Sequence, residues 1–232
     1  MLLLHHPYPW ITTDWNITLH VCSEKEQLYV RSLETTWDMA HTIEGATKGQ
    51  STSLDWHKLR RPRLTSSRFR EVCHIRGQSL AENLANQIIK GSPQTAVTKR
   101  ALAMEPAAVN EYCHIKNGNY TPCGFVIHPD ALWLGSSPDG LIYDPIKSPQ
   151  FGLLEIKCPN SKSYVDCPYL KFQRGKLELM PQHAYYCQEQ GQMLITGLEW
   201  DDFVLFAEED MLIQHIYKDS VVANTIKEKA DH

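Results

Sequence analysis

The sequence lacks the features of several protein classes. It has seven cysteines, an odd number, and none of them forms a Cys-x-x-Cys pair. This spacing argues against a zinc ribbon and against a disulfide framework, and it favours reduced thiols. No apolar stretch approaches the ~20 residues of a membrane span, and the leucine run after Met1 is too short for a signal peptide. We therefore expect a soluble intracellular protein, nuclear or cytoplasmic, with no membrane contact.

An overall excess of basic charge is also missing. The formal net charge is -4, so any surface that binds a polyanion must be local. Residues 58 to 76 offer such a surface, because seven basic residues stand there against one acidic residue. This segment is also rich in hydroxyl groups, and a hydroxyl-rich, basic helix start is a suitable phosphate site.

The 232 residues are enough for one main domain. Residues 1–53 have no clear periodicity and end in a linker-like stretch from Gly45, so we interpret them as an extension of unknown role. Residues 54–232 hold the main domain. Helical spacing is predicted over 79–90, 96–116, 183–196 and 220–232, with short strands over 124–128, 132–134, 141–143, 153–157, 203–207 and 212–217. This order predicts an α/β fold with an antiparallel meander, and 159–181 as a loop.

The strongest chemical signal is Pro138-Asp139 followed by Glu155-x-Lys157. Because alternate side chains of a strand share a face, Glu155 and Lys157 are predicted to lie side by side. A hairpin would bring the Asp139 carboxylate against Glu155. Two such oxygen ligands suit Mg²⁺ or Mn²⁺, and Lys157 suits the orientation or deprotonation of a water molecule.

The same residues have a simpler interpretation. Asp139 would form an Asx-turn, and Glu155 and Lys157 would be a solvated pair on a strand. Most chance matches to a D-x(n)-E-x-K pattern are of this kind. Further polar groups on the predicted helices to either side favour the catalytic interpretation. These groups are Glu105, Gln188 and Gln190.

Five segments, in chain order, strengthen the catalytic interpretation. They are Trp56-His-Lys-Leu-Arg with Leu64-Thr-Ser-Ser-Arg-Phe, Met104-Glu-Pro, Gly135-Ser-Ser-Pro-Asp-Gly, Leu154-Glu-Ile-Lys-Cys-Pro, and Tyr186-Cys-Gln-Glu-Gln-Gly-Gln-Met. Together they resemble the YqaJ-type viral recombinase nucleases of the PD-(D/E)XK superfamily, the group that includes phage lambda exonuclease. The resemblance covers roughly residues 54 to 218. It implies a restriction-endonuclease-like core, a mixed central β-sheet flanked by α-helices.

The resemblance also implies roles for individual residues. The metal ligands would be Glu105, Asp139, Glu155 and the carbonyl of Ile156. Lys157 would activate the attacking water and Gln190 would help to position it, with Gln188 as its near neighbour.

A second set of residues would bind the nucleic acid. Arg60 and Ser67 match the pair that binds a DNA 5′-phosphate, and Arg63 and Arg68 are candidate contacts to the DNA backbone, although a solvated basic face is an equal alternative for each arginine.

Relatives of this kind digest duplex DNA from the 5′ end, so the resemblance implies a 5′-to-3′ exonuclease in recombination or end processing. It also implies a single-strand annealing or recombinase protein as a partner, and a homo-oligomer as in some relatives. Two alternatives stay open. The first alternative to an exonuclease is a DNA-end binding module that has lost activity. The second is a nicking endonuclease.

Overall fold

A computed structural model describes residues 23–91, 95–117, 119–173 and 175–230. The helices are α1 (Glu24–Ser32), α2 (Trp37–Ala46), α3 (Leu54–Arg60), α4 (Phe69–Cys73), α5 (Gln78–Lys90), α6 (Ala96–Lys116), α7 (Ala184–Thr196) and α8 (Ser220–Ala230), with short 3-10 helices η1 (Gln50–Thr52), η2 (Ser66–Arg68) and η3 (Tyr164–Asp166). The strands are β1 (Leu64–Thr65), β2 (Asn119–Pro122), β3 (Val126–Ile127), β4 (Leu134–Ser136), β5 (Gly140–Tyr143), β6 (Phe151–Lys157), β7 (Leu170–Gln173), β8 (Lys176–Leu179), β9 (Trp200–Phe206) and β10 (Met211–Tyr217).

The main sheet has five strands in the order β10-β9-β6-β5-β2. Strands β6 and β9 pair in parallel and the other neighbours pair antiparallel, so the sheet is mixed. The expected mixed sheet between helices is therefore confirmed. The expected meander over 124–157 is interrupted. Strand β3 pairs antiparallel with β4, and β5 with β6, but β3 and β4 join β1 in a separate small sheet and β4 does not pair with β5.

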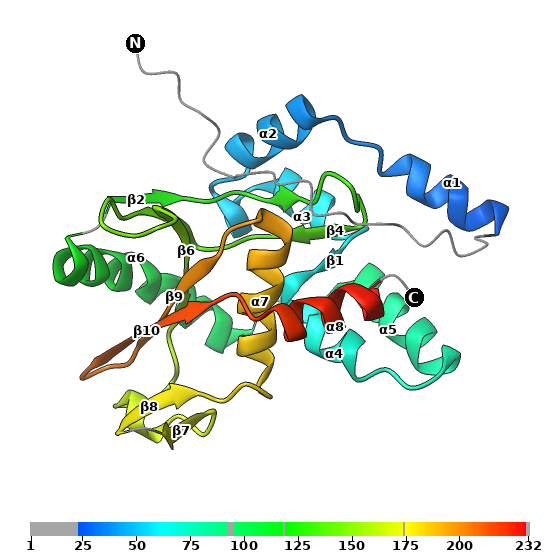
Figure 1. Ribbon diagram of the computed structural model, residues 1–232. Helices are drawn as coiled ribbons and strands as arrows, with labels where there is room; N and C mark the ends of the chain where they lie inside the picture. The colour runs from blue at the N-terminus through cyan, green and yellow to red at the C-terminus, as the bar shows by residue number, and fades with distance from the viewer. Residues whose placement is uncertain (1–22, 92–94, 118, 174, 231–232) are drawn as a thin grey trace, which may run out of the picture.

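Helices cover both faces of the main sheet (Figure 1). On one face, Leu154 and Ile156 of β6 pack with Ala108 and Tyr112 of α6. On the other, Leu153 lies in a larger core that includes residues of α7 and α8. The Tyr112 hydroxyl also donates to the Oδ2 of Asp202 at 2.6 Å, which ties α6 to β9. Helices therefore pack on both faces of β6, and its five central residues are buried.

The two helices that flank β6 have defined ends. The Thr95 hydroxyl accepts from the Thr98 N–H at the start of α6, and the ring of His183 accepts from the Tyr185 N–H at the start of α7. Helix α7 ends at Gly197, whose φ of 74° is the left-handed conformation that glycine adopts without steric cost.

The predicted loop 159–181 was wrong in its middle. Strands β7 and β8 pair there as an antiparallel hairpin that projects from the rest of the chain (Figure 1). The hairpin is partly exposed on both faces, and Phe172 is 68% exposed. Without one buried face the alternation of polar and apolar residues that identifies a strand is weak.

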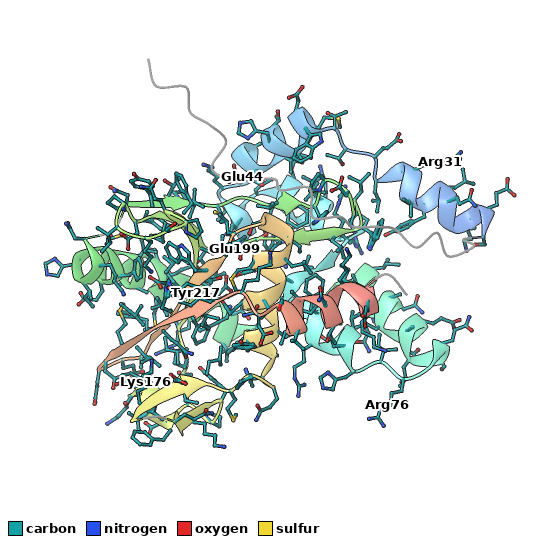
Figure 2. All side chains as sticks on the ribbon, in the orientation of Figure 1. Arg31, Glu44, Arg76, Lys176, Glu199 and Tyr217 are labelled. Carbon is teal, nitrogen blue, oxygen red and sulfur yellow. The ribbon has the colours of Figure 1, made fainter. Side chains whose placement is uncertain are left out.

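The linker predicted from Gly45 was also wrong, because the end of α2 and η1 occupy it. The Gly124 N–H donates to the Oε1 of Glu44 at 2.9 Å, and the Phe125 N–H donates to the Oγ1 of Thr47 at 2.7 Å. Figure 2 labels Glu44 on α2. The first 22 residues of the expected extension lie outside the described part of the chain. None of the helices that the structure describes is long and apolar enough to cross a membrane.

Candidate active site

Asp139 stands at the start of β5 and is held on three sides. The Ile156 N–H donates to its Oδ2 at 2.7 Å, and the Tyr120 hydroxyl donates to its carbonyl at 3.0 Å. The carbonyl of Pro138, just before it, accepts from the side chain of Gln50 at 2.8 Å. Because both its backbone and its carboxylate are fixed, Asp139 is preorganised toward β6.

Glu155 lies on the face of β6 that α7 covers, and it is 3% exposed. The Lys157 ammonium donates to its Oε1. The side-chain amides of Gln188 and Gln192 donate to Oε1 at 2.5 Å and to Oε2 at 2.7 Å. These three donors allow a carboxylate to stay charged while it is buried.

Glu105 reaches the same place from α6 and hydrogen-bonds Asp139. Burial raises the pKa of Glu105 and the charge of Glu155 adds to the rise, although the hydrogen bond with Asp139 opposes it. Burial also raises the pKa of Asp139 well above its usual value, and Glu155 and Glu105 both contribute. Three carboxyl groups thus crowd one site, and Glu155 and Glu105 disfavour ionisation of Asp139.

This crowding suits a divalent cation. Across the residues that the structure describes, no three His, Cys, Asp or Glu side chains close into a ready-made cation site. The carboxyl groups of Glu105, Asp139 and Glu155 nevertheless bring several oxygen donors to one place beside Lys157. Hard oxygen donors of this kind are the ligands that Mg²⁺ and Mn²⁺ prefer. The donor set therefore fits the expected metal.

Lys157 completes the cluster. Its side chain is 19% exposed, and its ammonium lies 5.1 Å from the centre of the Tyr185 ring. Burial disfavours the charged form, but the carboxylates of Glu155 and Asp139 outweigh that effect and raise the pKa of Lys157 above its usual value. Lys157 is therefore an ammonium at neutral pH.

An open cavity of about 960 Å³ is connected to this cluster through Arg60, which lines it and interacts electrostatically with Glu155. Arg60 and Ser67 both line it. Arg60 donates to the Oγ of Ser137 at 3.0 Å, and its guanidinium lies 4.1 Å from the centre of the Trp56 ring. Burial lowers the pKa of Arg60 to about 10, with Glu155 opposing the fall, so the side chain stays charged and senses the carboxylate cluster. A fixed cation in a polar cavity is suited to a phosphate group.

Comparison with known proteins agrees with this geometry. The profile of the YqaJ-like viral recombinase domain matches residues 55–199, well over half of the chain. The chain belongs to the YqaJ-like viral recombinase family. None of the curated protein sequences compared with the chain matches it significantly.

The fold of the chain is similar to the folds of solved nuclease structures. An alkaline exonuclease from Laribacter hongkongensis is 26% identical, with a TM-score of 0.61 over 77% of this chain and 89% of that one. The Shutoff and Exonuclease Protein of Kaposi's sarcoma-associated herpesvirus is 14% identical, with a TM-score of 0.57 over 83% of this chain and 70% of that one, and so shares the fold. The chain is thus homologous to an alkaline exonuclease.

The structure places the side chains of two predicted site residues, Gln190 and Arg63, away from the carboxylate cluster. Gln190 does not face the carboxylates, because its amide donates to the Tyr217 carbonyl at 3.0 Å and accepts from the Asp219 N–H at 2.7 Å. Successive helix residues are rotated by about 100°, so residues 188 and 192 share a face and residue 190 points away. Gln188 does reach the site.

Arg63 is not free to contact DNA, because it is 5% exposed and its guanidinium donates to the carbonyls of Leu33, Leu59 and Leu132. It ties α1 and α3 to the loop before β4. Arg68 lines the cavity and forms an ion pair with Glu71 at 3.0 Å, and its contact with DNA stays a prediction.

Two residues of the YqaJ-type site were missed in the sequence. Gln192 was four positions from Gln188, so the helical period could have identified it. Ser137, whose hydroxyl accepts from both Arg60 and Trp56, lies inside the Ser-Pro-Asp motif and gave no separate signal.

A second pair of carboxyl groups lies behind Glu155. Glu189 and Asp201 are both 0% exposed, and their four carboxyl oxygens meet no donor group in the described part of the chain. The two carboxyl groups lie close enough for each to affect the ionisation of the other. Burial raises the pKa of both groups. The charges of Asp201 and Glu155 raise the pKa of Glu189 further.

Glu189→Gln is expected to stabilise the fold at high pH. A carboxyl group whose folded pKa is raised binds its proton more tightly in the folded state, so stability falls as pH rises above the unfolded pKa. Glutamine keeps a donor toward Asp201 and does not titrate. Urea unfolding should therefore show a gain over wild type that grows by up to about 1.4 kcal/mol per pH unit from near pH 4. Glu111→Gln, at an exposed position of α6, is the control. A gain that is equal at pH 4 and pH 8 would contradict the prediction.

Proposed function

We propose that this chain is a divalent-metal-dependent deoxyribonuclease that hydrolyses DNA phosphodiester bonds, as a 5′-to-3′ exonuclease on duplex ends. The observation that carries the proposal is the convergence of Glu105, Asp139, Glu155 and Lys157 beside the cavity that Arg60 lines. Homology to an alkaline exonuclease supports the same reaction. Recombination or end processing is the role that fits the family, with an annealing protein as partner and a homo-oligomeric state as parts of the same proposal.

The metal ligands would be Glu105, Asp139, Glu155 and the carbonyl of Ile156. A bound Mg²⁺ or Mn²⁺ supplies polarisation of the phosphate and a bound water of lowered pKa. The Ile156 N–H already fixes the Asp139 carboxylate, so the strand itself sets the spacing of two ligands. Gln188 and Gln192 orient Glu155 from behind.

Lys157 would contribute its positive charge to this reaction. Because its pKa is raised, Lys157 is protonated at neutral pH, and its first contribution would be to hold the attacking water and to stabilise the negative charge that develops on the phosphate. The ammonium is fixed by Glu155 and needs no rearrangement to do this. Lys157 would have a second role as a base once it loses its proton. High pH, or neutralisation of the carboxylates that raise its pKa, favours that loss.

Arg60 and Ser67 would bind the 5′-phosphate of a DNA end and so give the reaction its direction. Both residues line the cavity, and Arg60 is near enough to Glu155 to interact with it electrostatically. An end held there would present the adjacent phosphodiester to the carboxylate cluster. An endonuclease would not need to bind a 5′-phosphate at these residues.

The test compares three substrates: linear duplex with a 5′-phosphate, linear duplex with a 5′-hydroxyl, and closed circular DNA, each with Mg²⁺ or EDTA. The proposal expects magnesium-dependent loss of linear DNA with mononucleotide products, fastest with the 5′-phosphate. Binding of ends without hydrolysis would identify a DNA-end binding module instead. Cutting of circles would identify a nicking endonuclease.

Arg60→Ala is expected to reduce the preference for a 5′-phosphate selectively. A charge-assisted contact is worth about 1.5–3 kcal/mol, so the ratio of rates on phosphorylated and hydroxyl ends should fall by roughly 10- to 100-fold. The rate on hydroxyl ends should change little. Initial rates on the two substrates measure the ratio, and Arg76→Ala on the exposed segment before α5 is the control. An unchanged ratio in Arg60→Ala would remove Arg60 from the phosphate site.

A further inference from the structure

Gln50 connects two loops at the candidate active site. Its side-chain amide donates to the Pro138 carbonyl at 2.8 Å and to the Cys123 carbonyl at 3.1 Å. Pro138 directly precedes Asp139, and Cys123 directly follows β2, the strand that pairs with β5. One amide group therefore bridges the end of β2 and the residues just before β5, where Asp139 lies.

The backbone at Gln50 is adapted to this contact. Its φ is 42°, the left-handed region that residues other than glycine enter at a cost of roughly 1 kcal/mol or more. The Gln50 N–H donates to the Thr47 carbonyl at 2.8 Å, which holds this turn closed after α2. Such strain persists only where surrounding contacts determine the conformation.

Helix α2 supplies those contacts. Its last turn accepts two backbone hydrogens of the loop after β2, through Glu44 and Thr47. The helix also lies so close to Gly124 that a Cβ there would stand 1.9 Å from the Glu44 carbonyl oxygen. Because only glycine permits this approach, α2 docks at one defined position and carries Gln50 with it.

Gln50 lies before the matched family domain, which begins at residue 55, yet it also lines the cavity that contains Arg60. We propose that Gln50 is a positioning residue that fixes Asp139 through the Pro138 carbonyl, so that the functional nuclease unit begins at α2. This inference rests on the proposed function for the reaction that Asp139 serves. It assigns a role to part of the N-terminal extension.

A purely structural role for Gln50 predicts different behaviour. If the amide only held α2 in place, its loss would lower the free energy of unfolding and the folded fraction, while each folded molecule would keep its affinity for metal and its kcat. A positioning role predicts a change in both quantities within folded protein. The contact to Pro138 would matter in particular, because that carbonyl belongs to the peptide joined to Asp139.

The experiment uses the full chain with three replacements at Gln50. Gln50→Leu keeps the bulk without the donor, Gln50→Glu faces two carbonyl oxygens with a carboxylate, and Gln50→Gly accepts the left-handed backbone without strain. Gln78→Leu, at an exposed position on α5, is the matched control. The readouts are kcat and KM on phosphorylated duplex, the Mn²⁺ dissociation constant by calorimetry without DNA, the melting temperature, and amide hydrogen exchange over residues 136–143.

All three variants are expected to lower kcat and to weaken Mn²⁺ binding by roughly 10- to 100-fold, with KM changed by less than about threefold. Exchange over 136–143 should speed up in each variant and stay unchanged in Gln78→Leu. Wild-type kcat and Mn²⁺ affinity in folded Gln50→Gly would overturn the proposal, and so would unchanged exchange. If the wild type neither cleaves DNA nor binds Mn²⁺, the proposed function fails, while the exchange data still decide whether Gln50 holds the Asp139 loop.

Discussion

Asp139→Asn is expected to lower metal-dependent hydrolysis of DNA by about 1,000-fold or more and, in the absence of metal, to raise the melting temperature. Asparagine has nearly the shape of aspartate, and its carbonyl oxygen can still accept from the Ile156 N–H. It removes the charge of a carboxyl group whose ionisation Glu155 and Glu105 both disfavour. Activity and stability should therefore move in opposite directions.

Two measurements test this pair of effects. In EDTA, the melting temperature should rise by about 2–4 °C for each kcal/mol of relieved repulsion. Addition of Mn²⁺ should stabilise the wild type strongly and the variant weakly, because stabilisation by a ligand follows its affinity for the folded state. Asp166→Asn, at an exposed position in η3, should leave activity and melting temperature as they are. A variant that is inactive and less stable in EDTA would indicate a structural role for the Asp139 charge.

The spacing in the sequence was sufficient to predict the centre of the site. A two-residue separation on a strand placed Glu155 and Lys157 on one face, and the structure pairs them. The α/β class followed from the order of short strands and amphipathic segments, whereas the mixed sheet was implied by the family resemblance, and the boundaries of α6 match the predicted 96–116. These features depend on local periodicity, which a single sequence records directly.

Contacts between distant segments were not predictable in this way. The choice between Gln190 and Gln192 depended on which face of α7 meets β6, and the sequence carries glutamine at both positions. Arg63 stood in a basic run, but three carbonyls from separate segments enclose it. Gln50 stood in a stretch of small polar residues that resembles a linker. In each case the partner is a backbone carbonyl or a buried carboxylate, groups that leave no pattern in the sequence.

Lys157→Met is expected to abolish hydrolysis to a similar extent, by about 1,000-fold or more, and to make the fold sensitive to pH. Methionine fills much of the same volume without the charge. Lys157 lowers the pKa of Asp139 and opposes the raised pKa values of Glu105 and Glu189. Its loss therefore raises the folded pKa of these carboxyls further above their unfolded values, and stability must fall more steeply as pH increases above about 4.

Addition of Mn²⁺ to Lys157→Met separates two roles of the Lys157 charge, which are neutralisation of the carboxylates and assistance to the reaction. If Lys157 serves both to neutralise the carboxylates and to assist the reaction, saturating Mn²⁺ should recover much of the stability lost at pH 8, because the cation replaces the ammonium in the first role. Hydrolysis should stay absent, because the cation cannot replace Lys157 in the second. Lys116→Met, at the exposed end of α6, is the control for loss of a lysine. Recovery of activity together with stability would show that the catalytic contribution of Lys157 is charge balance alone.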